Sequence, residues 1–527
     1  MSSGDLAIQA AAAQQAIDRG GGDGHDWMLV ALHRSAADDV AGADAAFAKA
    51  RALEPHNPAI LTGMAIHLRR QGRIRDAVLA CDAAIQAWPD YADAWLERGS
   101  LLTMGNSPLA HASFVRAAEL DPGNPAAHAA LAAIAARLGQ ADEARRHADR
   151  ALALQPGHPL AICALASVAT DTGNPQQARA MLEDLIPRLT EASSDRSLAL
   201  GMLGNACHKL GDASHAFDAW EKSKADFYEL NEPSLKGRLT HREFVEGVTQ
   251  ALQSVPDAKW AAVRTAGHPA GEAPRHIFVM GYPRSGNTLL ENILASLPGT
   301  FALEERPTLS LADHTYLNGS TQEIVAGLSD FADLDEEDLD RFRQDYWDMV
   351  RSTGMPADAA AFVDMDPLKG TRLPLISRLF PDASVLLMRR DPRDVVFSCF
   401  RTNFAFSSGT LDFTTVERTA RHYDAMMRLT ELALERLPLK VREVHYHRLV
   451  QNFDEETKAI CAFADLEWSA QVHRFANTAQ QRGVTTASVG QVRQGLFDGT
   501  RQWEPYARYL DPVMPILQPW IEKFGYS

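Results

Sequence analysis

The pattern of hydrophobic and polar positions divides the chain near residue 275 into two parts with different periods. In the first part, apolar residues recur at helical spacing, most clearly at Ala141, Ala144, Ala148 and Ala151. In the second part, helical stretches alternate with short apolar runs at 276–281, 360–364, 383–389 and 440–446. This alternation predicts a parallel sheet covered by helices on both faces. The chain is therefore expected to be multidomain, with an all-α part followed by a three-layer, P-loop-like α/β domain.

Prolines and glycines recur at a nearly fixed interval through the all-α part. The prolines are 34, 33 and 34 residues apart, at Pro55, Pro89, Pro122 and Pro156. The glycines are 33, 34 and 34 residues apart, at Gly72, Gly105, Gly139 and Gly173. A period near 34 residues is that of tetratricopeptide repeats. The sequence resembles that family over about 28–185, with a looser copy at 195–230.

The resemblance to tetratricopeptide repeats implies a superhelix with a concave face that commonly holds a peptide or a segment of a protein partner. Two other roles are equally compatible with the pattern: support of the neighbouring domain, and self-association. The predicted organisation has four regions, which are an N-terminal tail at 1–27, the repeat domain at 28–251, a linker rich in proline, glycine and alanine at 252–274, and the α/β domain at 275–527.

Composition narrows the possible partners and location. The formal net charge of −16 disfavours nucleic acid as the main partner, because a phosphate backbone requires a basic face. No run of 18 apolar residues occurs, so no membrane span is predicted. The N-terminus lacks the basic start of a signal peptide. The five scattered cysteines form no CxxC pair, which indicates a reducing compartment, and we expect a cytoplasmic location.

The segment HIFVMGYPRSGNTLL at 276–290 carries the strongest functional pattern. A short apolar strand leads through a glycine-bounded loop into a helix, whose N-terminal N–H groups and dipole suit a phosphate. Gly286 and Thr288 stand at P-loop positions, but Asn287 stands where a nucleotide triphosphatase has its lysine. Arg284 lies inside the loop instead. The loop is therefore expected to bind an anionic nucleotide without the usual lysine and magnesium.

A second candidate phosphate site lies in SVLLMRRDPRDVVFSCF at 384–400. Arg390 and Ser398 are eight residues apart after a predicted strand, and they offer a forked charged donor and a hydroxyl donor. Asp391 and Asp394 would repel a phosphate, so we expect them to cap the helix or orient the arginines. Together with the upstream loop, this block predicts a site that binds one nucleotide through two separate phosphate groups.

Four blocks in order make residues 275–527 resemble a sulfotransferase domain, similar to the tyrosylprotein sulfotransferase branch. They are GYPRSGNTLLENILASLPGTFALEERP, DMDPLKGTRLPLISRLFPDASVLLMRRDPRD, VHYHRLV and TTASVGQVRQGLFDGTRQWEPY. The resemblance implies an enzyme that transfers a sulfuryl group from 3′-phosphoadenosine 5′-phosphosulfate (PAPS) to an acceptor hydroxyl without a metal. Protein tyrosine, a glycan hydroxyl and a small-molecule alcohol are the alternative acceptors.

The resemblance also implies roles for individual residues. It assigns the 5′-phosphosulfate to Arg284, Ser285, Gly286, Asn287 and Thr288. It assigns the 3′-phosphate to Arg390 and Ser398. It assigns the rest of the nucleotide to Tyr446, Ser488, Gln491 and Arg493, with Arg501 or Trp503 as further candidates. The catalytic pair that it implies is Glu304 as the base and Arg284 as the cation that stabilises the leaving oxygens.

Other interpretations of the site are also open. Glu305 and His314 are alternative bases. The family has a lysine before the DP dipeptide, where this chain has Met365, and Lys369 is a possible substitute. A P-loop kinase or nucleotide triphosphatase is one alternative function, but Asn287 disfavours it. The other is a scaffold with a non-catalytic nucleotide-binding domain.

Overall fold

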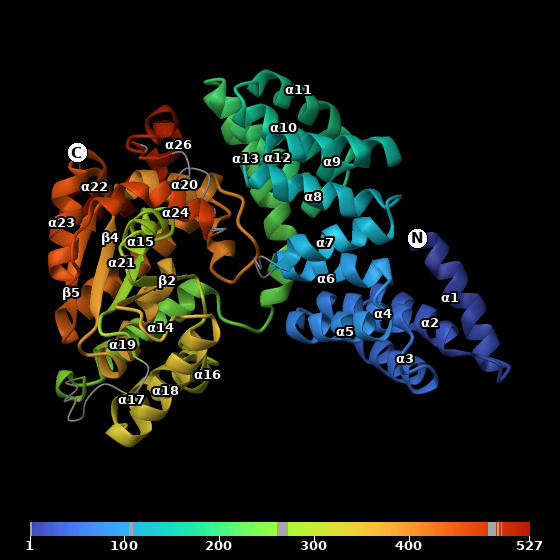
Figure 1. Cartoon of the computed structure of the whole chain (residues 1–527), viewed down its shortest axis with the longest axis horizontal. Helices are drawn as coiled ribbons and strands as arrows, with labels where there is room; N and C mark the ends of the chain where they lie inside the picture. Colours follow the sequence, from blue (N-terminus) through green and yellow to red (C-terminus); the bar gives the residue numbers. More distant parts are fainter. Residues whose placement is uncertain are drawn as a thin grey trace. The chain divides into compact units, whose positions relative to one another are not determined.

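The computed structural model describes residues 3–104, 109–260, 272–482, 492, 495–496 and 498–526. They form two compact units, Met1–Leu185 and Ile186–Ser527 (Figure 1). The first unit is helical throughout its described part, and the second contains a sheet flanked by helices. This is the predicted combination of a repeat superhelix and an α/β domain.

The first unit is built from consecutive helix pairs that stack on one another (Figure 1). Helix α1 (Ser3–Asp18) precedes the pairs, which are α2 (Gly24–Ala36) with α3 (Val40–Leu53), α4 (Pro58–Arg70) with α5 (Ile74–Ala87), α6 (Ala92–Met104) with α7 (Leu109–Leu120), α8 (Pro125–Arg137) with α9 (Ala141–Leu154), and α10 (Pro159–Asp171) with α11 (Pro175–Leu185). Asn57 and Asn124 cap α4 and α8, each just before a proline at the first helical position. Gly72 and Gly139 adopt positive φ between the two helices of a pair, a conformation that glycine tolerates best.

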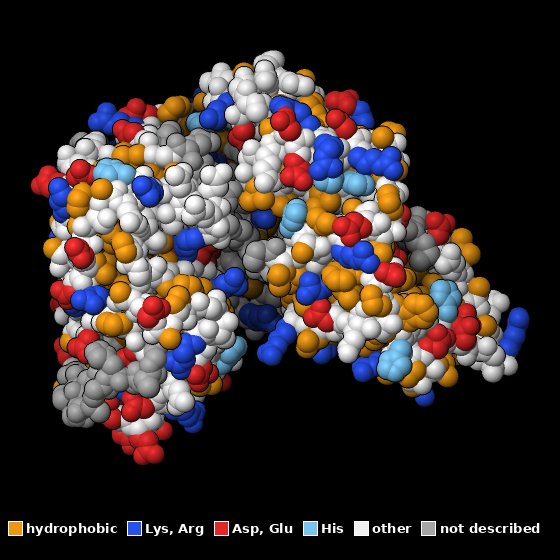
Figure 2. All heavy atoms as spheres, viewed as in Figure 1, with side chains coloured by type: hydrophobic (Ala, Val, Ile, Leu, Met, Phe, Trp, Pro, Cys, Tyr) orange, Lys and Arg blue, Asp and Glu red, His pale blue; other side chains and the backbone are white. Residues whose placement is uncertain are grey.

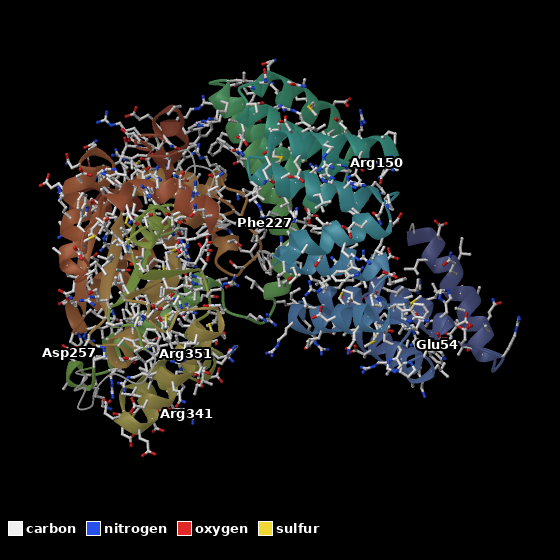
Figure 3. The ribbon with its side chains drawn as sticks, in the orientation of Figure 1. Glu54, Arg150, Phe227, Asp257, Arg341 and Arg351 are labelled. Carbon is white, nitrogen blue, oxygen red and sulfur yellow. The ribbon has the colours of Figure 1, made fainter. Side chains whose placement is uncertain are left out.

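Small side chains allow these helices to approach closely. Ala144, Ala148 and Ala151 of α9 are fully buried against α8 and α10. Glu54, labelled in Figure 3, joins three helices, because its carboxylate accepts hydrogen bonds from the backbone N–H of Gly24 (3.1 Å) and from the amide of Asn57 (2.6 Å). The periodic alanines of the sequence therefore lie in the contacts that stack the repeats.

The second unit is organised around a five-stranded, fully parallel sheet with the order β2-β3-β1-β4-β5. Its strands are β1 (His276–Gly281), β2 (Thr300–Glu304), β3 (Ala361–Met365), β4 (Ser384–Arg389) and β5 (Lys440–His445). All four apolar runs of the sequence lie in this sheet. The short edge strand β2 did not appear in the sequence as a separate apolar run.

Helices cover both faces of the sheet, and the side chains of each strand alternate between them. Ile277 and Val279 face a cluster formed with α15 (Asn287–Ala295), α22 (Tyr446–Gln451), α23 (Phe453–Phe463) and α24 (Phe475–Gln481). Phe278 and Met280 face the larger cluster. The described helices on that side include α14 (His241–Ser254), α16 (Ser310–Tyr316), α17 (Thr321–Ala332), α18 (Glu336–Ser352), α19 (Leu373–Leu379), α20 (Pro392–Arg401), α21 (Val416–Arg436), α26 (Ala507–Leu510) and α27 (Met514–Lys523).

The surface is mixed in charge. On the face shown in Figure 2, acidic and basic side chains are interspersed over both units. Among the helices of the described residues, none is long and apolar enough to cross a membrane.

The second unit begins earlier in the chain than the sequence pattern suggests. Helices α12 (Ser194–Lys209), α13 (Ala213–Asn231) and α14 lie within it, although the pattern assigns them to the repeat domain. Trp220 and Trp260 are fully buried in its core. Arg436 donates to the carbonyls of Leu252, in the last turn of α14, and of Val255 just after it, and pairs with Asp257, labelled in Figure 3, at 2.5 Å. The described residues 252–260 of the predicted linker therefore pack within the second unit.

We expect a fragment beginning at Ile186 to fold and a fragment beginning at Arg275 to fail to fold. The shorter fragment lacks the buried tryptophans and the apolar face of α14, and each large apolar side chain contributes about 1.5–3 kcal/mol when buried. Together these losses approach the whole stability of a domain, about 5–15 kcal/mol. Thermal unfolding followed by circular dichroism would compare the two fragments. Equal, cooperative transitions in both would contradict this boundary.

Candidate functional site

The 282–286 loop, Arg390 and Tyr446, which the sequence singled out, lie at the carboxyl edge of the sheet. Strands β1, β4 and β5 end there at Gly281, Arg389 and His445. The chain continues from them into the 282–286 loop, Arg390 and Tyr446. The strand order reverses around β1, and the crevice at such a reversal is where parallel α/β sheets bind ligands.

The loop between β1 and α15 has a strained backbone that fits an anion. Arg284 has a φ of 69° and Gly286 a φ of 106°, so the chain turns sharply before the helix begins at Asn287. A Cβ at Gly286 would lie 2.7 Å from the ring of Tyr446 and 2.9 Å from Met388. Glycine is therefore required both for its backbone angle and for the close approach of its neighbours.

Gly286→Ala is expected to weaken nucleotide binding as well as stability. A left-handed conformation costs a residue with a Cβ roughly 1–2 kcal/mol, and Tyr446 and Met388 would also have to move. Gly354→Ala is the matched control, because Gly354 has a φ of +97° with open space around it. Calorimetry with adenosine 3′,5′-bisphosphate and urea unfolding would separate the two effects. Equal nucleotide affinity in the two variants would contradict the role given to Gly286.

Arg284, Arg390 and Ser398, predicted from two separate motifs, are in direct contact. Arg284 Nε donates to Ser398 Oγ at 3.0 Å, and Arg390 Nη1 donates to the carbonyl of Arg284 at 2.8 Å. Burial lowers the pKa of Arg284 to about 10, and the positive charge of Arg390 adds to the shift. Two neighbouring guanidinium groups of this kind favour an anionic ligand that carries more than one charge.

Arg390 is positioned from several sides and keeps one donor unused. Its guanidinium lies over the ring of Tyr446, 4.8 Å from the centroid, and donates to the carbonyl of Gly499. Its Nε is buried without a hydrogen-bond partner among the described residues. A buried donor of a charged group is costly to leave unpaired, so this atom fits a site for a phosphate oxygen.

Asn287 takes a structural role at the position of the P-loop lysine. Its amide nitrogen donates to the carbonyl of Tyr282 at 2.9 Å and so closes the loop. Ser285 and Thr288 are buried beside it. The side chain that a nucleotide triphosphatase directs at the phosphates is here part of the loop scaffold.

Asp391 of the second motif has the predicted capping role, whereas Asp394 binds backbone N–H groups of a segment far along the chain. Asp391 caps α20 by accepting from the backbone N–H of Arg393 at 2.9 Å, and it pairs with that guanidinium at 2.7 Å. Asp394 accepts from the backbone N–H groups of Arg501 (2.8 Å) and Trp503 (3.2 Å). Asp394 therefore holds the segment 498–503, which we call the closing segment, against the site.

The last predicted block is only partly described. Ser488, Gln491 and Arg493 lie outside the described residues. Arg501 is exposed, and its side chain lies 3.8 Å from Glu504. The indole of Trp503 lies against the guanidinium of Arg393, which is 4.3 Å from the ring centroid.

The candidate bases lie two strands away from the loop. Glu304 ends β2 and is paired in register with Met365 of β3, which is paired in turn with Val279 of β1. With neighbouring strands about 4.8 Å apart, β2 lies about 10 Å from β1. Glu304 is partly buried, on the side of the sheet covered by α15. His314 is exposed on α16.

Glu305 has a different environment from Glu304. It has a φ of 43°, and its backbone N–H donates to the carbonyl of Met365 at 2.7 Å. Desolvation raises the pKa of Glu305 to about 8, and the charges of Asp366 and Glu304 add to the shift. The side chain of Glu305 is exposed, and a carboxylate with a pKa near neutrality can accept a proton, so Glu305 stays an alternative base.

Lys369 does not occupy the place of the missing lysine. Its ammonium is buried against Asp364 and donates to Thr308 at 3.0 Å. Asp364 and Met365 are consecutive in β3 and point to opposite faces of the sheet. Lys369 therefore stabilises the polar cluster on one face, while Met365 lies in the apolar cluster of the other.

An ion pair near the base was not evident from the sequence. Arg482 pairs with Glu291 of α15 at 2.6 Å and donates to the carbonyl of Ala302 in β2 at 2.9 Å. Burial raises the pKa of Glu291 to about 7, and the charge of Glu304 adds to the shift. In the sequence, Glu291 looks like an ordinary acidic residue within a helix. Only the fold shows that it lies near the candidate base.

The described residues contain no group of three or more histidine, cysteine, aspartate or glutamate side chains placed to hold a metal ion.

Comparison with known families gives the same two parts as the motifs. Residues 274–470 match the sulfotransferase family. The matches to tetratricopeptide repeats cover 30–92, 62–103, 100–159 and 135–201. The chain therefore combines a sulfotransferase domain with tetratricopeptide repeats.

Relatives with curated descriptions match about half of the chain. An uncharacterized protein of Aquifex aeolicus is 31% identical over 265 residues, 49% of this chain, and the match spans 34% of that protein's length. A putative protein-tyrosine sulfotransferase of Caenorhabditis briggsae is 25% identical over 46% of this chain and 86% of its own length. Protein-tyrosine sulfotransferase 1 of Danio rerio is 24% identical over 48% and 72%, respectively. These matches support a sulfotransferase.

Proposed function

We propose that the protein is a PAPS-dependent sulfotransferase that transfers a sulfuryl group to an acceptor hydroxyl. The observation that carries the proposal is the contact between Arg284, Arg390 and Ser398 at the carboxyl edge of the sheet. Two guanidinium groups, a serine hydroxyl and a helix N-terminus meet there, as a nucleotide with two separate phosphate groups requires. The family match over 274–470 supports the same reaction class.

The proposed division of roles is the one that the family resemblance implies. The 282–286 loop and α15 bind the 5′-phosphosulfate, while Arg390 and Ser398 bind the 3′-phosphate. Arg284 stabilises negative charge on the leaving oxygens. Glu304 accepts the proton of the acceptor hydroxyl as the new S–O bond forms and the bond from sulfur to the phosphate oxygen breaks.

The choice between this function and its two alternatives depends on particular residues. A kinase or nucleotide triphosphatase requires a lysine that reaches the phosphates, but Asn287 is hydrogen-bonded to its own loop. Met365 favours a non-catalytic nucleotide-binding scaffold, because it leaves one family cation missing. The chain retains the phosphate-binding loop, both arginines and the carboxylate at the end of β2, which argues against a non-catalytic scaffold.

Two titrations and one turnover measurement distinguish these three functions. Adenosine 3′,5′-bisphosphate is expected to bind the full chain without added metal, and ATP with magnesium is expected to bind far more weakly. Tight binding of ATP with magnesium, together with weak binding of the bisphosphate, would favour the kinase or triphosphatase. Binding of the bisphosphate without any turnover of PAPS would favour the scaffold.

For the acceptor, we propose a protein tyrosine, with the repeats holding the acceptor protein or another partner. The names of the relatives from Caenorhabditis briggsae and Danio rerio support a tyrosine acceptor. A tyrosine peptide, an oligosaccharide and a small phenol offered separately with PAPS would test this proposal. Transfer only to the oligosaccharide or only to the phenol would reject it.

We also propose that the protein works in the cytoplasm. All five cysteines are free and buried, as expected in a reducing compartment. Microscopy of a fluorescent fusion in cells would test this location, and an extracellular signal would reject it.

A further inference from the structure

The helical pair α12–α13 packs directly against α20, the helix that carries Ser398. Trp220 of α13 lies edge-on to Phe397 of α20, with ring centroids 5.7 Å apart, and also contacts Tyr506. Gly204 of α12 permits this packing, because a Cβ there would lie 2.4 Å from the indole. This pair lies outside the 274–470 family match, yet it supports a helix of the nucleotide site.

A buried lysine joins the same two elements. Lys224 of α13 donates its ammonium to the carbonyl of Thr402, the C-cap residue of α20. Burial lowers the pKa of Lys224 to about 8, a value at which the group remains mostly charged near neutral pH. A cation at a helix C-terminus stabilises the last carbonyls and the helix dipole. Lys224 therefore fixes the far end of α20.

His208 of α12 connects this helical pair to the candidate site. Its Nε2 lies 3.1 Å from Arg401 Nη1, and its Nδ1 lies 2.8 Å from the hydroxyl of Tyr506. Burial lowers the pKa of His208 to about 4, and the charge of Arg401 adds to the shift, so the ring is neutral near pH 7. Because a guanidinium can only donate, Nε2 is the acceptor and the proton is on Nδ1, which donates to Tyr506.

Arg401 connects His208 to the segment that contacts Arg390. Its other terminal nitrogen donates to the side-chain oxygen of Gln502 in the closing segment. The same segment presents the carbonyl of Gly499 to Arg390. Partial burial lowers the pKa of Arg401 to about 10, and the positive charges of Arg284 and Arg390 add to the shift. The three guanidinium groups therefore lie close enough to interact.

We propose that His208 is a positioning residue of the nucleotide site, which acts through Arg401 and Gln502 to hold the closing segment against Arg390. The inference rests on the proposed function, because the nucleotide is the ligand whose binding it affects. It assigns helix α12, which has the sequence pattern of a repeat, to the support of the anion site. Loss of the His208 acceptor leaves Arg401 free to turn away and releases Gln502.

The test compares two substitutions that each keep one half of the histidine. His208→Gln places an amide oxygen near the position of Nε2 and retains an acceptor for Arg401. His208→Asn resembles Nδ1 and retains only a partner for Tyr506. His215→Ala is the matched control, since His215 is an exposed histidine on the adjacent helix α13 and pairs with Asp212. Each full-length variant is titrated with adenosine 3′,5′-bisphosphate, and its melting temperature is measured.

We expect His208→Asn to weaken binding of the bisphosphate about tenfold, which corresponds to one hydrogen bond to a charged group. His208→Gln is expected to bind within about twofold of the wild type, even where its melting temperature falls as much as that of His208→Asn. Equal affinities of the asparagine variant and the His215→Ala control would overturn the inference but leave the proposed function intact. Equal weakening in the asparagine and glutamine variants would also overturn it, because a purely structural role would then suffice. Failure of the wild type to bind the bisphosphate would reject both.

Discussion

Glu304→Gln is expected to lower turnover by about two to four orders of magnitude while leaving nucleotide affinity nearly unchanged. The amide keeps the size of the side chain and part of its hydrogen bonding, but it cannot accept the proton of the acceptor hydroxyl. Glu304 ends the strand paired with β3, so it lies at the same sheet edge as the arginines but two strands from the 282–286 loop. In the proposed reaction the acceptor hydroxyl would therefore reach Glu304 across the end of β3.

The decisive comparison uses Glu305→Gln and His314→Asn in parallel with Glu304→Gln. Glu305 has a raised pKa, to about 8, from desolvation and neighbouring carboxylates, and its backbone is bonded to β3. His314 is exposed on α16. Because Glu304 stands at the position that the family motif assigns to the base, both of these variants are expected to keep most of their sulfate transfer. Full activity in Glu304→Gln, with loss in either of the others, would assign the base elsewhere.

Arg390→Ala is expected to weaken nucleotide binding by roughly 2–4 kcal/mol, a factor of about thirty to a thousand. The substitution removes the charge-assisted bond to the 3′-phosphate. It also removes the bonds of Arg390 to the carbonyls of Arg284 and Gly499, which fix the loop and the closing segment. The expected loss therefore includes binding and preorganisation of the site.

Arg428→Ala provides the control for Arg390→Ala. Arg428 is an arginine of the same unit on the exposed surface of α21, where it pairs with Asp424. Its removal changes the net charge equally but is expected to leave affinity for adenosine 3′,5′-bisphosphate unchanged. Calorimetry showing the same affinity in Arg390→Ala and Arg428→Ala would rule out the 3′-phosphate assignment.

The periodicity of the sequence predicts the fold of both units but misplaces the boundary between them. The 34-residue spacing and the strand pattern predict the repeat helices and the parallel sheet. They cannot show what a helical pair packs against. The copy at 195–230 has the glycine and alanine phase of a repeat, but its Trp220 and Lys224 contact α20 and Thr402 instead of another repeat. A local pattern specifies a helical hairpin, whereas its packing partner depends on residues almost 200 positions away.

In the site as well, some contacts follow from local sequence motifs, whereas others join residues far apart in the chain. The loop from Arg284 to Thr288 and the Arg390–Ser398 pair are local motifs, and the structure brings them into contact. Lys369 and Met365 lie on opposite sides of the sheet, because Lys369 pairs with Asp364 and because Asp364 and Met365 point to opposite faces of β3. Their spacing of four residues in the sequence does not reveal this. The connection from His208 to Arg401 joins positions far apart in the chain and has no sequence motif.

The release of adenosine 3′,5′-bisphosphate from PAPS by the full chain is the measurement that tests the central claim most directly. It would be made with EDTA present and with a tyrosine peptide, an oligosaccharide and a phenol as acceptors, in parallel with the Glu304→Gln variant. We expect release that one of these acceptors accelerates, that EDTA does not suppress, and that falls at least about a hundredfold in the variant. Release that is no faster in the wild type than in Glu304→Gln, although both bind the bisphosphate, would contradict a catalytic function.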